Sequence, residues 1–232
     1  VEELAQAFPD FVAPQFGVHP WWAMSHRAND EWVEKLRSLL TNNAGAGVGE
    51  CGLDGARKKD IPMDLQLKVL RPQLELAKEL QRPVSLHCVA AHGAMLETLK
   101  SAFGEKHAPG IVLHSYCGSP EMVPAFAKLN CFFSFSASIL HIGKHAGALR
   151  AVPEDRLLIE TDSPDQLPKK LRSPEDPDKE HVRTDADGDL LNEPAWLPLI
   201  LHGASEIREV PVADLGALTA ANARRVFRWS EA

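Results

Sequence analysis

The sequence has 232 residues, of which 44% are hydrophobic and 25% are charged, and this composition excludes an extensively disordered chain. The length predicts one large globular domain over residues 1–232. The formal net charge of −7 argues against a general polyanion-binding protein, which is more often basic, so a phosphate substrate has to be held by local cations.

Short apolar runs alternate with amphipathic stretches along most of the chain, which is typical of repeated strand and helix units around a parallel sheet. After a helical pattern over residues 1–8, six strands are predicted, at residues 11–18, 45–51, 83–88, 110–116, 131–137 and 156–162. Helical patterns follow the strands, at residues 30–40, 63–80, 91–103, 119–129, 143–152, 193–210 and 212–229. Pro72 lies inside one of these patterns and predicts a kink or a fresh start of that helix.

A polar stretch rich in proline and aspartate follows the last predicted strand, from Ser163 to Asp189. A loop of this length in a compact domain is usually functional or mobile, and this one leaves a strand end where a barrel keeps its chemistry. Basic residues in the loop and after the second strand are candidate phosphate contacts, with a solvated surface as the alternative. These residues are Arg57, Lys58, Lys59, Lys169, Lys170 and Arg172.

Polar residues close five of the six predicted strands: His19, Glu50, His87, His114 and Asp162. Because the carboxyl ends of parallel strands converge on one rim of a barrel, these five side chains are expected to meet in space. Two imidazoles and two carboxylates offer the mixed nitrogen and oxygen ligands that suit Mg, Mn or Zn. A divalent metal ion is therefore predicted at Glu50, His87, His114 and Asp162.

The four cysteines form no C-x-x-C pair, which is typical of reduced thiols rather than of a disulfide framework. Cys51 and Cys88 each follow a predicted metal ligand, so strand alternation points them away from the metal and into the core. Reduced thiols indicate a reducing compartment, and a cytoplasmic or nuclear location is expected. No apolar run approaches the length of a membrane span, so no membrane partner is expected.

Several motifs of the sequence occur in the order typical of one enzyme family. They are GVHP (17–20), VGECGLD (48–54), PVSLHC (83–88), VLHSYCGSPEM (112–122), LLIETDSP (157–164), NEP (192–194) and LTAANARRVF (218–227). Over nearly its whole length the chain resembles the TatD-related deoxyribonucleases, which are metal-dependent hydrolases of the amidohydrolase-like barrel group. The resemblance implies a TIM-type (β/α)8 barrel of the α/β class. It places two further strands before residue 11, so the chain is expected to lack the first two strands of the barrel.

The resemblance also implies roles for the predicted metal ligands. Glu50 is similar to the carboxylate that binds or bridges metal, and His87 and His114 are similar to the imidazole ligands. Asp162 is similar to the ligand that also takes the proton of the attacking water, so Asp162 and Glu50 are the expected catalytic residues. The sequence contains no H-x-H pair, which family members typically carry on the first barrel strand.

Substrate contacts are implied at His19 and His92, which the resemblance places against the substrate phosphate. Trp21 and Trp22 directly follow GVHP, where they are candidates for stacking on nucleobases, with packing over the barrel mouth as the alternative.

The resemblance implies hydrolysis of DNA phosphodiester bonds, as a Mg-dependent 3′–5′ exonuclease that uses a metal-activated water. DNA is then the partner expected, as substrate, and no protein partner is implied. Two alternatives stay open. One is a metal-dependent hydrolase of a non-nucleic ester or amide, because barrels host many reactions. The other is an inactive truncated barrel that acts only through interactions.

Overall fold

A six-stranded parallel sheet forms the centre of the protein. The computed structural model describes residues 1–26, 31–104, 109–167 and 191–227. The strands are β1 (Gln15–Phe16), β2 (Gly47–Asp54), β3 (Val84–Val89), β4 (Ile111–Leu113), β5 (Cys131–Phe135) and β6 (Leu157–Ile159). Each strand pairs in parallel with the next one along the chain, so the order across the sheet is β1 to β6. All six predicted strands are confirmed.

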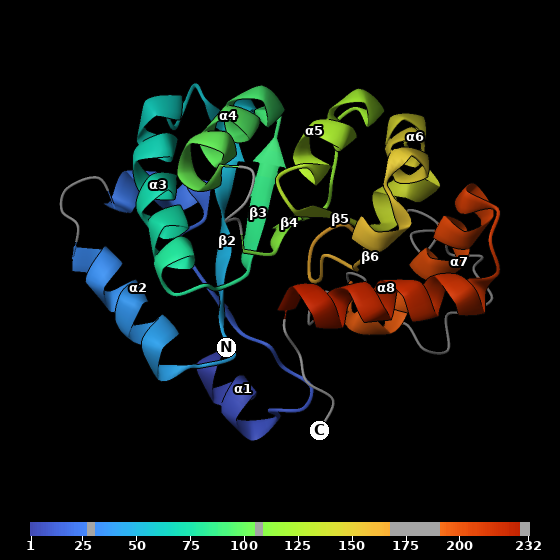
Figure 1. Ribbon diagram of the computed structural model, residues 1–232, viewed down its shortest axis with the longest axis horizontal. Coiled ribbons are helices and arrows are strands. Elements are labelled where there is room, and N and C mark those ends of the chain that lie inside the picture. Colours follow the sequence, from blue (N-terminus) through green and yellow to red (C-terminus); the bar gives the residue numbers. More distant parts are fainter. Residues whose placement is uncertain (27–30, 105–108, 168–190, 228–232) are drawn as a thin grey trace.

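Most helices follow strands and lie on one side of the sheet, whereas the last helix packs through Val226 against Val112, Phe132 and Leu158 on the other face (Figure 1). The helices are α1 (Glu2–Ala7), α2 (Glu31–Asn42), α3 (Met63–Glu79), α4 (His92–Phe103), α5 (Val123–Ala127), α6 (Gly143–Ala151), α7 (Leu197–Arg208) and α8 (Val212–Phe227). Three 3-10 helices, η1 (Pro20–His26), η2 (Gly55–Arg57) and η4 (Ala137–Leu140), follow strand ends. Helix α3 continues through Pro72, so the fresh start considered for that position does not occur. Among the described helices, none has the length and apolarity that crossing a bilayer requires.

The core lies between the sheet and the helices that cover it. All five residues of β5 are buried, as expected for a strand covered on both faces. Tyr116 packs edge-on against Phe133 and Phe135, with ring centroids 5.1 and 6.1 Å apart. Each such side chain contributes about 1.5–3 kcal/mol by leaving water. The four cysteines are free thiols, and Cys51 and Cys88 are buried, which confirms their interpretation as core residues.

Two buried glutamines of α3 fix the backbone of the loops that carry the site. Gln73 accepts a hydrogen bond from the N–H of Val18 at 2.7 Å and donates to the carbonyl of Val18 at 3.1 Å. Two turns earlier on the same face, Gln66 makes the equivalent pair with Asp54, at 2.7 and 3.0 Å. Buried polar groups cost free energy unless they are paired, so α3 holds the ends of β1 and β2 in defined positions.

Candidate metal centre

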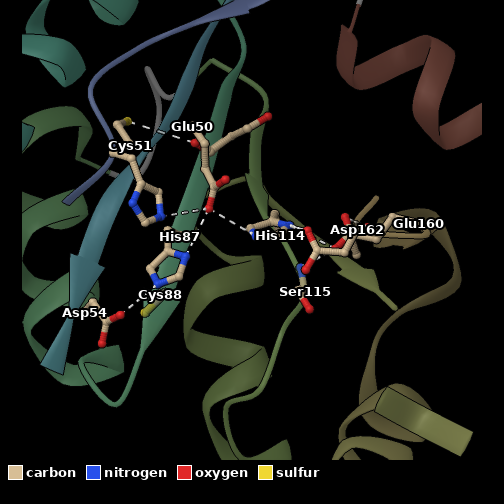
Figure 2. A network of polar contacts seen from close by, with 12 residues as sticks. Glu50, Cys51, Asp54, His87, Cys88, His114, Ser115, Glu160 and Asp162 are labelled. Carbon is tan, nitrogen blue, oxygen red and sulfur yellow. Dashed lines mark hydrogen bonds and ion pairs between the residues drawn. The ribbon is translucent and has the colours of Figure 1, made fainter. Parts of the chain in front are cut away.

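The five polar strand-end residues line a single cavity of about 790 Å³ at the carboxyl edge of the sheet. Glu50 lies within β2 and His87 within β3, whereas His19, His114 and Asp162 come directly or shortly after β1, β4 and β6. Figure 2 shows the central part of this arrangement, with the two imidazoles of His87 and His114 on either side of the Glu50 carboxylate. The structure therefore brings together the residues that the sequence places at separate strand ends.

Glu50 is the centre of the cluster, because one of its oxygens faces three imidazoles. Its Oε1 lies 3.0 Å from Nδ1 of His87, 3.1 Å from Nε2 of His114 and 3.4 Å from Nε2 of His19. His19, which was expected at the substrate phosphate, therefore lies among the potential metal ligands.

A local irregularity of β2 aims the Glu50 side chain into the cavity. The pairing register between β2 and β3 shifts between Val48 and Cys51, as at a β-bulge, and bulges commonly re-aim a side chain beside a functional site. Gly52, with a φ of 151°, follows the irregularity, and a Cβ atom there would lie only 2.0 Å from the carbonyl oxygen of His87. Only glycine allows β2 to approach His87 this closely.

The ring of His87 is fixed from its other side by Asp54, at the end of β2. Nε2 of His87 lies 3.3 Å from Oδ2 of Asp54, and the same oxygen accepts a hydrogen bond of 2.7 Å from the indole Nε1 of Trp21. The second oxygen of Asp54 accepts from the backbone N–H groups of Ala56 and Arg57. Asp54 is almost fully buried and its pKa is lowered, because these hydrogen bonds and the nearby His87 outweigh the burial that opposes its charge.

Glu160, which sequence reasoning did not select, holds His114 in the same way. Its Oε1 accepts from Nδ1 of His114 at 2.9 Å and from the N–H of Ser115 at 2.8 Å, and its Oε2 accepts from Ser134. The signal was present in the sequence. Glu160 stands two residues before Asp162 in the ETD motif, inside the predicted strand 156–162, where periodicity would place both on one face. In the structure β6 ends at Ile159, so both residues lie in the segment that follows the strand.

Asp162 approaches His114 from the side away from Glu50. Its Oδ1 lies 3.7 Å from Nδ1 of His114, and its Oδ2 accepts a hydrogen bond from Gln166. Asp162 adopts a left-handed backbone conformation, with φ of 59°, which for a residue other than glycine is strained and is found preferentially at functional sites. Burial and the charge of Glu160 raise the pKa of Asp162 to about 6, although the positive charge of His114 opposes the shift.

Charges at the centre are strongly coupled. Burial opposes ionisation of the Glu50 carboxyl, yet hydrogen bonds from the three imidazoles outweigh it and hold its pKa well below the ordinary value of 4.5. Burial likewise favours the neutral ring of His114, but the charge of Glu160 and hydrogen bonds to Glu160 and Glu50 raise its pKa to about 11. Without a metal ion, a carboxylate and an imidazolium therefore occupy the site together.

Two groups of potential metal ligands result, and the ligand atoms within each group lie within 4.8 Å of one another. The first comprises His19, Glu50 and His87, and the second comprises His114, Glu160 and Asp162. His114 connects the groups, because one of its nitrogens faces Glu50 and the other faces Glu160. The site is thus an extended cluster with two potential binding positions rather than one ring of four ligands.

The remaining candidate residues lie in different surroundings. His92 begins α4 and packs edge-on against Tyr116, outside the described lining of the cavity, and its Nε2 is buried without a hydrogen bond in the described part of the chain. Burial, together with the charge of Lys144, lowers the pKa of His92 to about 4, so its ring is neutral. The guanidinium of Arg57 lies 4.8 Å over the ring of Trp21, whereas Lys58 and Lys59 are exposed.

The basic residues predicted in the long loop, Lys169, Lys170 and Arg172, lie outside the described residues.

Comparison with known proteins agrees with this geometry. The profile of the family described as TatD related DNase matches residues 1–228. The chain belongs to this family. Its members are hydrolases that act on ester bonds, and the resemblance drawn from the sequence motifs is confirmed.

Similar proteins extend the comparison to sequence and fold. The chain is 35% identical over 229 residues to the 3′–5′ ssDNA/RNA exonuclease TatD of Edwardsiella piscicida, covering 97% of this chain and 81% of that protein. It is 29% identical to the uncharacterized metal-dependent hydrolase YabD of Bacillus subtilis, over 94% of this chain and 78% of YabD.

The crystal structure of YJJV, a TatD homologue of Escherichia coli, has a TM-score of 0.75 at 24% identity, covering 99% of this chain and 83% of that chain. The crystal structure of the TatD-family hydrolase of Entamoeba histolytica has a TM-score of 0.79 at 18% identity, and the match covers 97% of this chain and 79% of that chain. These neighbours are TIM barrels, and the six-stranded parallel sheet fits such a barrel lacking two strands, as expected from the sequence.

Proposed function

We propose that the chain is a metal-dependent phosphodiesterase that removes nucleotides from DNA as a 3′–5′ exonuclease. The observation that supports this most directly is the pairing of each central histidine with two carboxylates. His87 lies between Glu50 and Asp54, and His114 lies between Glu50 and Glu160. Histidines that bind metal usually have their second ring nitrogen fixed by a carboxylate in this way. The exonuclease named in a relative supplies the substrate class.

The donor set fits a divalent metal ion. Glu50, His87 and His19 offer one carboxylate and two imidazoles within the first group, and His114 and Asp162 offer a further imidazole and carboxylate. To bind an ion, His114 would have to give up the proton that it shares with Glu50, because a ligating imidazole must be neutral. Mg²⁺ is the proposed ion, and Mn²⁺ and Zn²⁺ are compatible with the same nitrogen and oxygen donors.

The proposed mechanism is direct attack by water on phosphorus. A bound divalent ion lowers the pKa of water and neutralises charge on a phosphoryl oxygen. The oxygen of the attacking water bonds to phosphorus while Asp162 accepts the proton of the water, and the bond between phosphorus and the leaving oxygen breaks. The leaving oxygen keeps the electron pair of that bond and takes a proton from solvent. Gln166 keeps the Asp162 carboxylate in place through a hydrogen bond from its amide. Asp54 and Glu160 hold the two central imidazoles in fixed orientations, so little reorganisation is needed during the reaction.

An assay of the purified chain tests this proposal. Cleavage of single-stranded DNA is measured with chelator and with Mg²⁺, Mn²⁺ or Zn²⁺, and simple esters and amides are offered in parallel. Chelator should abolish activity, and Asp162→Asn should lower kcat by roughly 10²–10⁴-fold, as expected for loss of a general base. Asp60→Asn is the matched control, because Asp60 is an exposed aspartate outside the described lining of the cavity.

Full activity in Asp162→Asn would show that Asp162 is not the proton acceptor. Hydrolysis of esters or amides without any cleavage of DNA would favour the non-nucleic substrate. Absence of any metal-dependent hydrolysis would contradict the proposed function as a whole.

A further inference from the structure

Trp22 lies at the cavity, and its large aromatic side chain makes no polar or ring contact with the described part of the protein. Its side chain is 63% exposed and lines the cavity together with Glu50 and His87. Its backbone is nevertheless anchored: the N–H of Trp22 donates to the carbonyl of His19 at 2.9 Å, and its carbonyl lies 2.9 Å from Nδ1 of His26.

The neighbouring Trp21 differs, because its ring is already engaged. Its indole Nε1 donates to Asp54, its ring stands edge-on to His19 with centroids 5.0 Å apart, and Arg57 lies over it. Trp21 is therefore part of the framework that holds the metal centre. Trp22 lies one residue further along η1, lines the same cavity and is largely exposed.

The charge of the cavity makes an aromatic contact important for a nucleic acid. Among the described residues that line it there is no lysine or arginine, whereas Glu50, Asp162 and Asp165 are acidic. In the described lining, phosphates next to the scissile one therefore meet no lysine or arginine, and the guanidinium of Arg57 lies over the ring of Trp21. Among the described residues of the cavity, the binding energy for a nucleotide comes from the metal centre and from contacts with the base, and stacking on an aromatic ring tolerates any base sequence.

We propose that the indole of Trp22 is a stacking platform for the unpaired nucleobase next to the scissile phosphate. This inference rests on the proposed nuclease function. Since η1 begins directly after His19, the platform is held beside the metal centre, and its anchored backbone lowers the entropy lost when a base binds. A base can stack there only after leaving its partner, so single-stranded ends are preferred over paired ends.

Binding and cleavage of two matched single-stranded oligonucleotides test the platform. One single-stranded oligonucleotide carries a normal 3′-terminal nucleotide, and its counterpart lacks that base. Affinity is measured by fluorescence anisotropy in an Asp162→Asn background, which slows cleavage, and kcat/KM is measured with Asp162 intact. Trp22→Ala should weaken binding and kcat/KM for the normal oligonucleotide by roughly 10–100-fold, while Trp22→Phe should retain most of both. On the abasic counterpart Trp22→Ala should have little effect.

Phe11→Ala is the matched control, because Phe11 is an aromatic residue 83% exposed outside the described lining of the cavity. It should bind and cleave like the unaltered chain. Equal losses on the normal and abasic oligonucleotides, or no loss on either, would overturn the platform. If the unaltered chain cleaves no DNA, the proposed function fails, and the binding comparison still decides the role of Trp22 separately.

Discussion

Nδ1 of His114 donates a hydrogen bond of 2.9 Å to Oε1 of Glu160, on the side of the ring opposite Glu50. This contact turns Nε2 of His114 toward Glu50, 3.1 Å away. Fixed imidazoles bind metal more tightly because no free energy is lost in orienting them.

Replacing Glu160 with glutamine tests this orientation. Glu160→Gln removes the charge that favours the required ring position but keeps the shape, so affinity for Mn²⁺ should fall by roughly 10–100-fold. Titration calorimetry measures the affinity, and a melting curve verifies that the variant is folded. Glu97→Gln is the control, because the Glu97 side chain is 72% exposed and pairs with Lys100 on the surface of α4. Unchanged affinity in Glu160→Gln would remove Glu160 from the positioning of the site.

The charges at Glu50 and His114 predict how the metal-free protein responds to pH. The pKa of His114 is raised from 6.5 to about 11, so its contribution to stability is complete below pH 6.5 and is lost as the pH rises toward 11. The pKa of Glu50 is lowered from 4.5, so its contribution is present above pH 4.5 and is lost as the pH falls further. The Glu50–His114 pair therefore stabilises the metal-free chain most between pH 4.5 and pH 6.5.

To isolate the contribution of the pair to stability, the unaltered chain and Glu50→Gln are denatured in the presence of chelator at pH values from about 4 to 9. The difference in the free energy of unfolding should be largest near pH 5–6 and should shrink above pH 7. Affinity for metal should change in the opposite sense and rise with pH, because binding releases the proton of His114. A metal affinity that is independent of pH would contradict the coupling.

The hydrogen bonds from Gln73 to Val18 predict a loss of stability when the amide is replaced. Gln73→Leu conserves most of the volume but leaves the N–H and carbonyl of Val18 without their partner. We expect the free energy of unfolding to fall by about 1–3 kcal/mol, measured by urea denaturation. Gln6→Leu, at an exposed position of α1, should change it by less than about 0.5 kcal/mol. Equal stability in both variants would mean that α3 does not fix the end of β1.

The contrast between strand ends and buried polar residues explains what the sequence could predict. Apolar runs fix six strands, and parallel strands share a direction, so the meeting of Glu50, His87 and His114 follows from the pattern alone. Gln73 could not be identified in this way, because a buried glutamine and an exposed one look the same in an amphipathic pattern. Which carboxylate faces which nitrogen of the His114 ring depends on side-chain rotamers and on the path of the loop after β6. Strand periodicity encodes neither.

Asp54 connects the metal centre with the aromatic wall of the cavity, and its replacement should affect both. In Asp54→Asn the side-chain oxygen can still accept from the N–H groups of Ala56 and Arg57, which keeps the turn. The amide nitrogen, however, cannot accept from Trp21 and His87. Metal affinity should fall roughly 10–100-fold.

Trp21 should become more mobile in the same variant, which time-resolved indole fluorescence anisotropy detects. Asp60→Asn, on the exposed surface, controls for the loss of one charge. If Asp54→Asn weakened metal binding without freeing the Trp21 ring, the two contacts of Asp54 would act independently. If neither property changed, the buried Asp54 carboxylate would serve only the turn at the end of β2.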